Sequence, residues 1–150
     1  MRTLHVTRYV GCPFSATIEL AELALRDRRD LIVSAAPALR ERASVSFRRV
    51  KDRDDQTRRH DALLLAWRPH HMTLFPDFHG VLTVRPKHQG VWLRIQGSYE
   101  PPLGLCGRVF DALLGRAIAR LTLKRLAADL AVKIEARWAA IRSGSKDVSG

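Results

Sequence analysis

The spacing of the apolar residues changes once along this chain, and that change limits the folds the chain can form. Between Ser44 and Tyr99 the apolar residues recur with a period of two in several short segments, most clearly from Val91 to Tyr99, which is typical of strands with one buried face. After Pro101-Pro102-Leu103-Gly104, a segment without proline runs from Leu105 to Arg142 with apolar residues at helical spacing. Short strands joined by tight connections predict an antiparallel meander, and the helix that follows is expected to cover its buried face.

The first forty residues add a strand and a short helix. Leu4–Val10 alternates and is rich in β-branched and aromatic residues, so it is predicted to be a strand that ends at Gly11. Pro13 suits the first turn of a helix, and apolar residues then recur at helical spacing as far as Leu25. Residues 31–40 stay open between a strand at 31–33 and a helical turn at 35–40. The expected fold is α+β, with a curved antiparallel sheet around a long C-terminal helix and a short helix after the first strand.

The length of 150 residues is usual for one domain. No linker interrupts the pattern, so we expect one domain over residues 1–142 and a flexible tail over 143–150. No apolar run is long enough for a membrane span, and residues 1–3 lead directly into the first strand without a secretory signal. These features predict a cytoplasmic protein.

The C-terminal helix is predicted to carry two apolar stripes. At 100° per residue the two stripes point about half a turn apart. The halves of the helix are therefore expected to pack on different surfaces, or the helix to bend near Thr122. The later stripe would pack on the first helix or on a second subunit, which leaves monomer and homodimer both open. The early stripe comprises Phe110, Leu113, Leu114, Ala117, Ile118 and Leu121, and the later one Leu123, Leu126, Leu130, Ile134, Trp138 and Ile141.

The chain is strongly basic, with 26 Lys and Arg against 15 Asp and Glu, a net charge of +11. Such an excess attracts phosphates and anionic lipid headgroups. The basic clusters, such as Arg48–Arg53, are interleaved with acidic residues, so we expect no nucleic-acid partner. A weak contact with an anionic membrane stays open.

No pattern in the sequence predicts a metal or catalytic site. The chain has six histidines, but neighbours such as His70 and His71 would point to opposite faces of a strand. Cys12 and Cys106 have no metal-binding spacing and are expected to be free thiols. The sequence holds no nucleophile elbow, no paired carboxylates and no glycine-rich phosphate loop. We therefore predict no metal and no cofactor, and the catalytic residues, if the protein is an enzyme, stay unknown.

Two segments resemble a known family. Gly97-Ser98-Tyr99-Glu100-Pro101-Pro102-Leu103-Gly104, followed by Gly107, Asp111 and Gly115, is similar to the end of small bacterial members of the helix-grip (START-like, SRPBCC) superfamily. The stretch from Phe75 to Val84 resembles their central strand. The superfamily includes lipid carriers and polyketide cyclases. The resemblance implies a cavity between the sheet and the terminal helix that holds an apolar small molecule.

On this basis we expect the protein to bind an apolar or amphipathic small molecule rather than to catalyse a reaction. Two alternatives stay open: an enzyme of the cyclase or hydratase type, and a basic module that docks on an anionic membrane or a protein partner. The polar groups expected in the cavity are His60, Arg94 and Tyr99. The expected cavity walls are Leu63, Leu65, Trp67, Leu82, Val84, Leu93, Ile95 and Tyr99 from the sheet, and Phe110, Leu114 and Ile118 from the helix.

Overall fold

The computed structural model describes residues 2–27, 30–36, 39–53, 59–70, 77–100 and 108–146, with side chains over 3–27, 42–51, 60–70, 77–100 and 115–145. This part of the chain forms six strands and two helices. The strands are β1 (Arg2–Val10), β2 (Asp30–Ala36), β3 (Leu39–Arg53), β4 (Arg59–Pro69), β5 (Asp77–Lys87) and β6 (Gly90–Glu100). The helices are α1 (Phe14–Arg26) and α2 (Arg108–Lys146).

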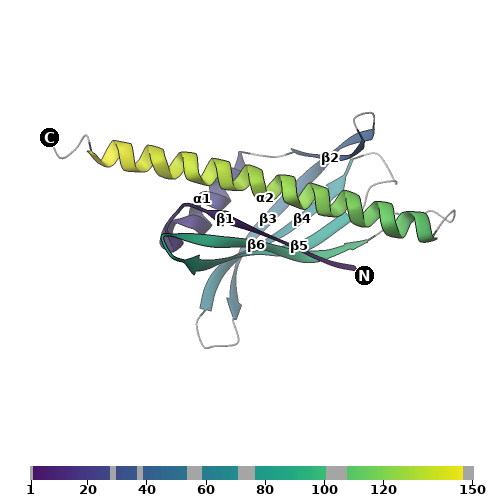
Figure 1. The fold of residues 1–150 in the computed structure, drawn as a ribbon, viewed down its shortest axis with the longest axis horizontal. Coiled ribbons are helices and arrows are strands. Elements are labelled where there is room, and N and C mark those ends of the chain that lie inside the picture. Colours follow the sequence, from purple (N-terminus) through teal and green to yellow (C-terminus); the bar gives the residue numbers. More distant parts are fainter. Residues whose placement is uncertain are drawn as a thin grey trace.

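The six strands form one antiparallel sheet in the order β1-β6-β5-β4-β3-β2. The chain leaves β1 at one edge, passes through α1 to β2 at the other edge, and returns strand by strand until β6 pairs with β1. Figure 1 shows the long helix α2 crossing the sheet, with α1 beside its C-terminal half. This is a helix-grip-like α+β fold, which confirms the predicted fold class.

The segment left open by the sequence is a pair of strands. β2 ends at Ala36 and β3 begins at Leu39, so the helical turn expected over 35–40 is wrong where the structure describes it. The two strands pair antiparallel, with Val33 opposite Glu41 and Ile32 opposite Arg42. At the other end of the chain, α2 continues to Lys146 and so extends into the expected tail.

One face of the sheet packs against the helices, and the strand register aligns its buried residues. Leu63, Leu82, Ile95 and Val6 stand opposite one another across β4, β5, β6 and β1, and all four are buried. Each such side chain contributes about 2 kcal/mol when it is removed from water. We call this face the inner face, and the opposite one the outer face.

Over the described side chains, the two stripes predicted on α2 join into one band. The buried residues form one band, in which Ile118, Thr122, Leu126, Leu130 and Ile134 follow at four-residue steps. Four residues exceed one turn by about 40°, so the band turns gradually around the helix. Its first part lies against the sheet, where Gly115 faces Tyr99. Its last part lies beside α1 (Figure 1), which is one of the two partners expected for the later stripe.

Some residues of the predicted stripes lie outside the band. Leu121 is 40% exposed and Ile141 is 51% exposed, and Ala117 is exposed as well. Small side chains such as Ala127, which we left out of both stripes, are buried. The side chains of Phe110, Leu113 and Leu114 lie outside the described ones.

Candidate functional site

The structure places most of the predicted cavity walls in one apolar cluster between the inner face of the sheet and the helices. The two residues whose side chains lie outside the described part are Phe110 and Leu114. The remaining nine are all buried: Leu63, Leu65, Trp67, Leu82, Val84, Leu93, Ile95, Tyr99 and Ile118. Residues that line a cavity and residues that fill a core are both buried. The cavity itself therefore stays a prediction.

An aromatic stack fills part of this cluster. The rings of Trp67 and Phe78 are stacked, with centroids 4.2 Å apart and an angle of 14° between their planes. Gly80 and Gly97 stand opposite each other in β5 and β6. A Cβ atom at either glycine would come within 2.6 Å of the Phe78 ring, so the glycine pair makes the space in which this ring lies. Phe78 is not among the cavity walls expected from the sequence, although two glycines on neighbouring predicted strands are a signal for a large ring beside them.

Tyr99 is the polar residue of this cluster. It stands opposite Phe78 in the register and is fully buried. Its ring lies under α2 at Gly115, where a Cβ atom would be 3.6 Å from Tyr99 Cε2. Within the described part of the chain, no group forms a hydrogen bond with the buried Tyr99 hydroxyl. A buried polar group without a partner costs about 1–3 kcal/mol, so this hydroxyl is a group that a bound molecule would satisfy.

Arg94 does not belong to the predicted cavity. It alternates with the buried residues Leu93 and Ile95 along β6, so its side chain is on the outer face. This corrects the expectation that Arg94 is a polar cavity group, and the period of two in a strand is the reason. Its Nε atom is buried and has no hydrogen-bond partner among the described residues.

His60 and Asp61, at the start of β4, make separate contacts. The half-buried His60 ring meets Phe14 of α1 edge-on, with centroids 5.5 Å apart. Asp61 forms an ion pair with Lys51. The hydrogen bond from Lys51 lowers the pKa of Asp61, and the positive charges of Lys51 and Arg49 lower it further. Burial raises this pKa and offsets part of the shift. Asp61 is therefore a carboxylate held by Lys51. His60 and Asp61 do not form an acid–base couple.

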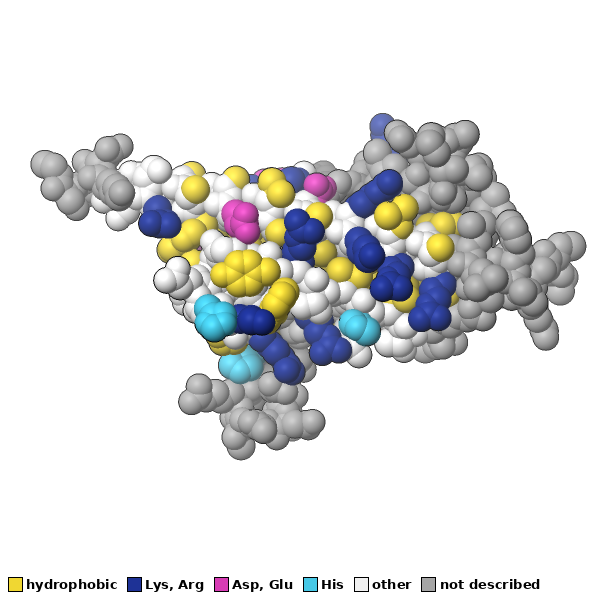
Figure 2. All heavy atoms as spheres, in the orientation of Figure 1, with side chains coloured by type: hydrophobic (Ala, Val, Ile, Leu, Met, Phe, Trp, Pro, Cys, Tyr) yellow, Lys and Arg dark blue, Asp and Glu magenta, His cyan; other side chains and the backbone are white. Residues whose placement is uncertain are grey.

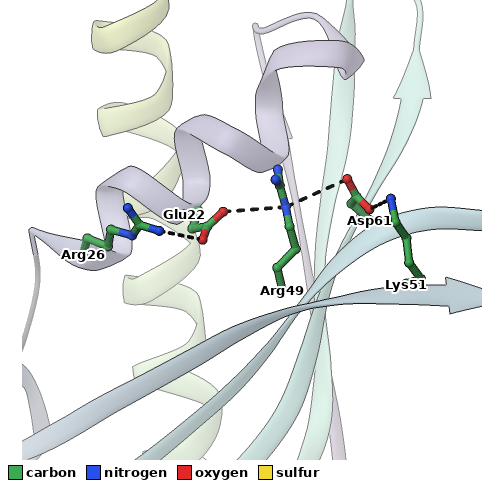
Figure 3. A network of polar contacts seen from close by, with 5 residues as sticks. All are labelled: Glu22, Arg26, Arg49, Lys51 and Asp61. Carbon is green, nitrogen blue, oxygen red and sulfur yellow. Dashed lines mark hydrogen bonds and ion pairs between the residues drawn. The ribbon is translucent and has the colours of Figure 1, made fainter.

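Asp61 belongs to a chain of ion pairs that joins α1 to the sheet (Figure 3). Arg49 Nε lies 3.9 Å from the Asp61 carboxylate and 3.6 Å from that of Glu22 in α1. Glu22 also pairs with Arg26 one helical turn later, at 3.1 Å. These contacts are exposed or half-buried, and pairs of this kind contribute about 0–1 kcal/mol each. Their role is to orient α1 on the sheet.

The described residues contain no group of three His, Cys, Asp or Glu side chains placed to hold a metal ion. Cys12 is buried. Burial raises the pKa of its thiol, and the negative charge of Glu135 raises it further. The hydrogen bond with Thr17 lowers this pKa and so partly offsets the rise. Cys106 lies outside the described residues.

In the parts of α1 and α2 that the structure describes, neither helix is long and apolar enough to cross a membrane.

Comparisons with known proteins support the fold. No protein-family model matches the chain, and no curated protein matches it. Among solved structures, it is similar to TTHA0849 from Thermus thermophilus, with a TM-score of 0.57, 13% identity, and 91% of this chain and 99% of that one covered. At this identity the likeness shows the fold alone.

Two further structures are more distant. DynU16, from the dynemicin biosynthetic locus, has a TM-score of 0.40 and 16% identity over 89% of this chain and 45% of DynU16. CV1439 from Chromobacterium violaceum has a TM-score of 0.33 and 12% identity over 85% of this chain and 96% of that one. Their superpositions are too loose to carry an argument about function.

Proposed function

We propose that this protein binds an apolar or amphipathic small molecule between the inner face of the sheet and α2, with the Tyr99 hydroxyl as its polar contact. The observation that carries the proposal is this hydroxyl, which is buried without a hydrogen-bond partner in the described structure. A buried polar group in a protein usually has a partner. A ligand with one oxygen atom on an apolar body would supply it.

The surroundings of Tyr99 favour an apolar ligand body. Phe78 lies beside it across the strands, and both are buried. On the helix side Gly115 faces the ring, and glycine presents no side chain there. A hydroxyl can donate and accept a hydrogen bond, so a carbonyl, a carboxylate or a hydroxyl on the ligand would satisfy it.

The test is the Tyr99→Phe variant, with Tyr9→Phe on the outer face as its control. Tyr99→Phe removes a hydroxyl without a protein partner, so the free energy of unfolding should stay the same or rise by about 1 kcal/mol. The same change should weaken binding of dansyl-undecanoic acid about tenfold, since a hydrogen bond to a charged group is lost. Fluorescence titration measures the affinity and urea unfolding the stability.

Two results would oppose the proposal. A large loss of stability in Tyr99→Phe would mean that the hydroxyl has a structural partner. Absence of probe binding by the unmodified protein would remove the basis for a ligand site. Tyr9→Phe should change neither quantity, since Tyr9 is 44% exposed and lies on the opposite face.

Gly115→Leu tests the location of the ligand. A side chain longer than Cβ at this position must extend into the space near Tyr99, since Cβ itself would already be in contact. If that space is open, the variant should keep its stability and lose the part of probe binding that Tyr99→Phe weakens. If it is filled, overpacking should cost about 1–3 kcal/mol, and the proposed location would be wrong. Gly144→Leu is the matched control, because a Cβ at Gly144 has no atom within 4 Å.

A further inference from the structure

The outer face of the sheet, away from Tyr99, carries a hollow of about 940 Å3. It extends over β3, β4, β5 and β6 and reaches Thr3 of β1. Figure 2 shows the molecule in the orientation of Figure 1, with Lys and Arg side chains spread over the described surface and few acidic ones among them. A strongly twisted sheet is saddle-shaped, so each of its faces is concave along one diagonal. The volume lies within the range of about 300–1,000 Å3 that small-molecule sites occupy.

The strand register divides the hollow into an apolar and a cationic part. Val81 and Leu64 stand opposite each other on β5 and β4 and form the apolar part, where Leu64 is 38% exposed. Two residues further along β5, and on the same face, Thr83 stands opposite Arg94 of β6. Arg48 lies beyond Leu64 on β3 and also lines the hollow. Two strand spacings, about 10 Å, separate the strand of Arg94 from that of Leu64.

The charges in the hollow have one sign. Three arginines line it, and none of the described lining residues is acidic. The Arg94 Nε atom is buried and has no hydrogen-bond partner in the described part of the chain. A guanidinium remains charged in a protein and presents its N–H groups in a fork that fits a carboxylate. A carboxylate in the hollow would therefore satisfy a buried donor that the described residues leave unsatisfied.

We propose that this hollow binds an organic carboxylate with a short apolar body, its head held by Arg94 and its body on Leu64 and Val81. The site is separate from the one at Tyr99, since the two lie on opposite faces of the sheet. Its occupant is a free small molecule, because the donor with no partner is buried rather than presented on the surface. Binding should weaken as salt is added, since added ions screen the attraction at the exposed rim.

Nuclear magnetic resonance with octanoate as the probe locates the site. At low salt, octanoate should shift the Arg94 Nε–H signal and the methyl signals of Leu64 and Val81. The methyl signals of Leu82 and Ile95 report on the inner face and serve as an internal comparison. Shifts confined to these inner methyls, or no shift at Arg94, would overturn the proposal. Tyr99→Phe should leave the Arg94 shift unchanged, so failure at one site is distinguishable from failure at the other.

Variants test the role of the guanidinium. Arg94→Gln should weaken octanoate binding about tenfold, since it removes a charge-assisted hydrogen bond. The affinity of Arg94→Lys should lie between those of Arg94→Gln and the unmodified protein. Arg120→Gln makes the same change of charge at an exposed position of α2 and should leave the affinity within about twofold, as expected when no contact is lost. Leu64→Glu, at an exposed position, should also weaken binding through repulsion of the carboxylate. Equal affinities for Arg94→Gln and Arg120→Gln would overturn the proposal.

Two further probes distinguish the chemistry. Octan-1-ol lacks the charge and acetate lacks the apolar body, so both should bind more weakly than octanoate. If octan-1-ol shifted the methyl signals of Leu64 and Val81 with the same affinity as octanoate, Arg94 would have no part in binding at the hollow. Arg94-dependent binding to phosphatidylglycerol vesicles, with no response to free octanoate, would identify a membrane surface as the partner and overturn the proposal.

Discussion

The backbone N–H of Gly11 donates a hydrogen bond to the carboxylate of Glu135, 124 residues later in the sequence, at 2.9 Å. Gly11 lies between β1 and α1, and Glu135 in the second half of α2. Beyond the other end of α1, Asp27 forms an ion pair with Arg137. Both ends of α1 are therefore attached to the same stretch of α2, which fixes the angle at which the two helices cross.

The first prediction concerns this hydrogen bond. Glu135→Ala should lower the free energy of unfolding by about 1 kcal/mol, the usual net contribution of one such bond. Urea unfolding at pH 7 measures the change. Glu19→Ala, an exposed position of α1, removes a carboxylate of the same kind and should change stability by less than about 0.5 kcal/mol. If Glu135→Ala and Glu19→Ala changed the free energy of unfolding equally, the hydrogen bond with Gly11 would contribute nothing to stability.

The second prediction tests the band of buried residues on α2. Leu126 and Ile134 are almost fully buried, and a glutamate at either position would leave a charge without a partner inside the core. Each change should cost several kcal/mol, enough to unfold a domain whose total stability is about 5–15 kcal/mol. Thermal unfolding followed by circular dichroism measures this.

Leu121→Glu and Val132→Glu are the matched controls on the same helix. These side chains are 40% and 63% exposed, so the changes should stay within about 0.5 kcal/mol of the unmodified protein. A large loss at Leu121 would restore the early stripe that the sequence predicted, and would show that this side of the helix is covered by a partner.

The third prediction follows from the ion pair between Asp61 and Lys51. The pKa of Asp61 is lowered in the folded protein, with the hydrogen bond from Lys51 as the main cause. Its contribution to stability is therefore complete above the unfolded-state pKa of about 3.9. As the pH falls below that value and through the lower pKa of the folded state, the contribution is lost.

Unfolding measured between pH 7 and pH 2 tests this pair. The Asp61→Asn variant should be less stable at pH 7 by up to about 1 kcal/mol, as expected for a partly exposed pair. The two proteins should approach each other in stability at the acid end of the series. A constant difference at every pH would show that the effect of Asp61→Asn comes from packing rather than from charge.

The strands and the fold class could be predicted because their signal is local. The alternation from Val91 to Tyr99 fixes which side of β6 is buried, and the structure has the same side buried. Tyr99 is one of the three polar cavity groups expected from the sequence, and its hydroxyl has no hydrogen-bond partner in the described structure. The same alternation should have excluded Arg94 from the inner face.

Other features depend on distances that a linear pattern does not contain. The band on α2 turns because it covers first the sheet and then α1, so a fixed helical stripe drawn from apolar residues placed Leu121 wrongly. The hollow on the outer face arises from the twist of the sheet, which brings Arg94, Leu64 and Arg48 together from three strands. No single stretch of the sequence holds that arrangement.

The last prediction concerns the paired glycines beneath Phe78. A Cβ atom at Gly97 would come closer than 3.0 Å to the His79 carbonyl oxygen and to Gly80 Cα, both backbone atoms, and to the Phe78 ring. A flexible side chain could move aside, but these backbone atoms belong to the adjacent strand. Gly97→Ala should therefore force the strands apart and cost about 1–3 kcal/mol, as overpacking does in a core.

Urea unfolding of Gly97→Ala beside two controls separates strain from simpler effects. Gly115→Ala should be neutral or stabilising by about 0.5–1 kcal/mol, because its Cβ has 3.6 Å to Tyr99 and alanine favours the helix over glycine. The double variant Gly97→Ala with Phe78→Leu removes the ring but keeps the clash with the backbone, so it should recover none of the loss. Full recovery in the double variant would show that the glycine pair serves only the ring. An unchanged stability in Gly97→Ala alone would show that β5 and β6 can separate there at no cost, and that the close pairing at the centre of the sheet is not required.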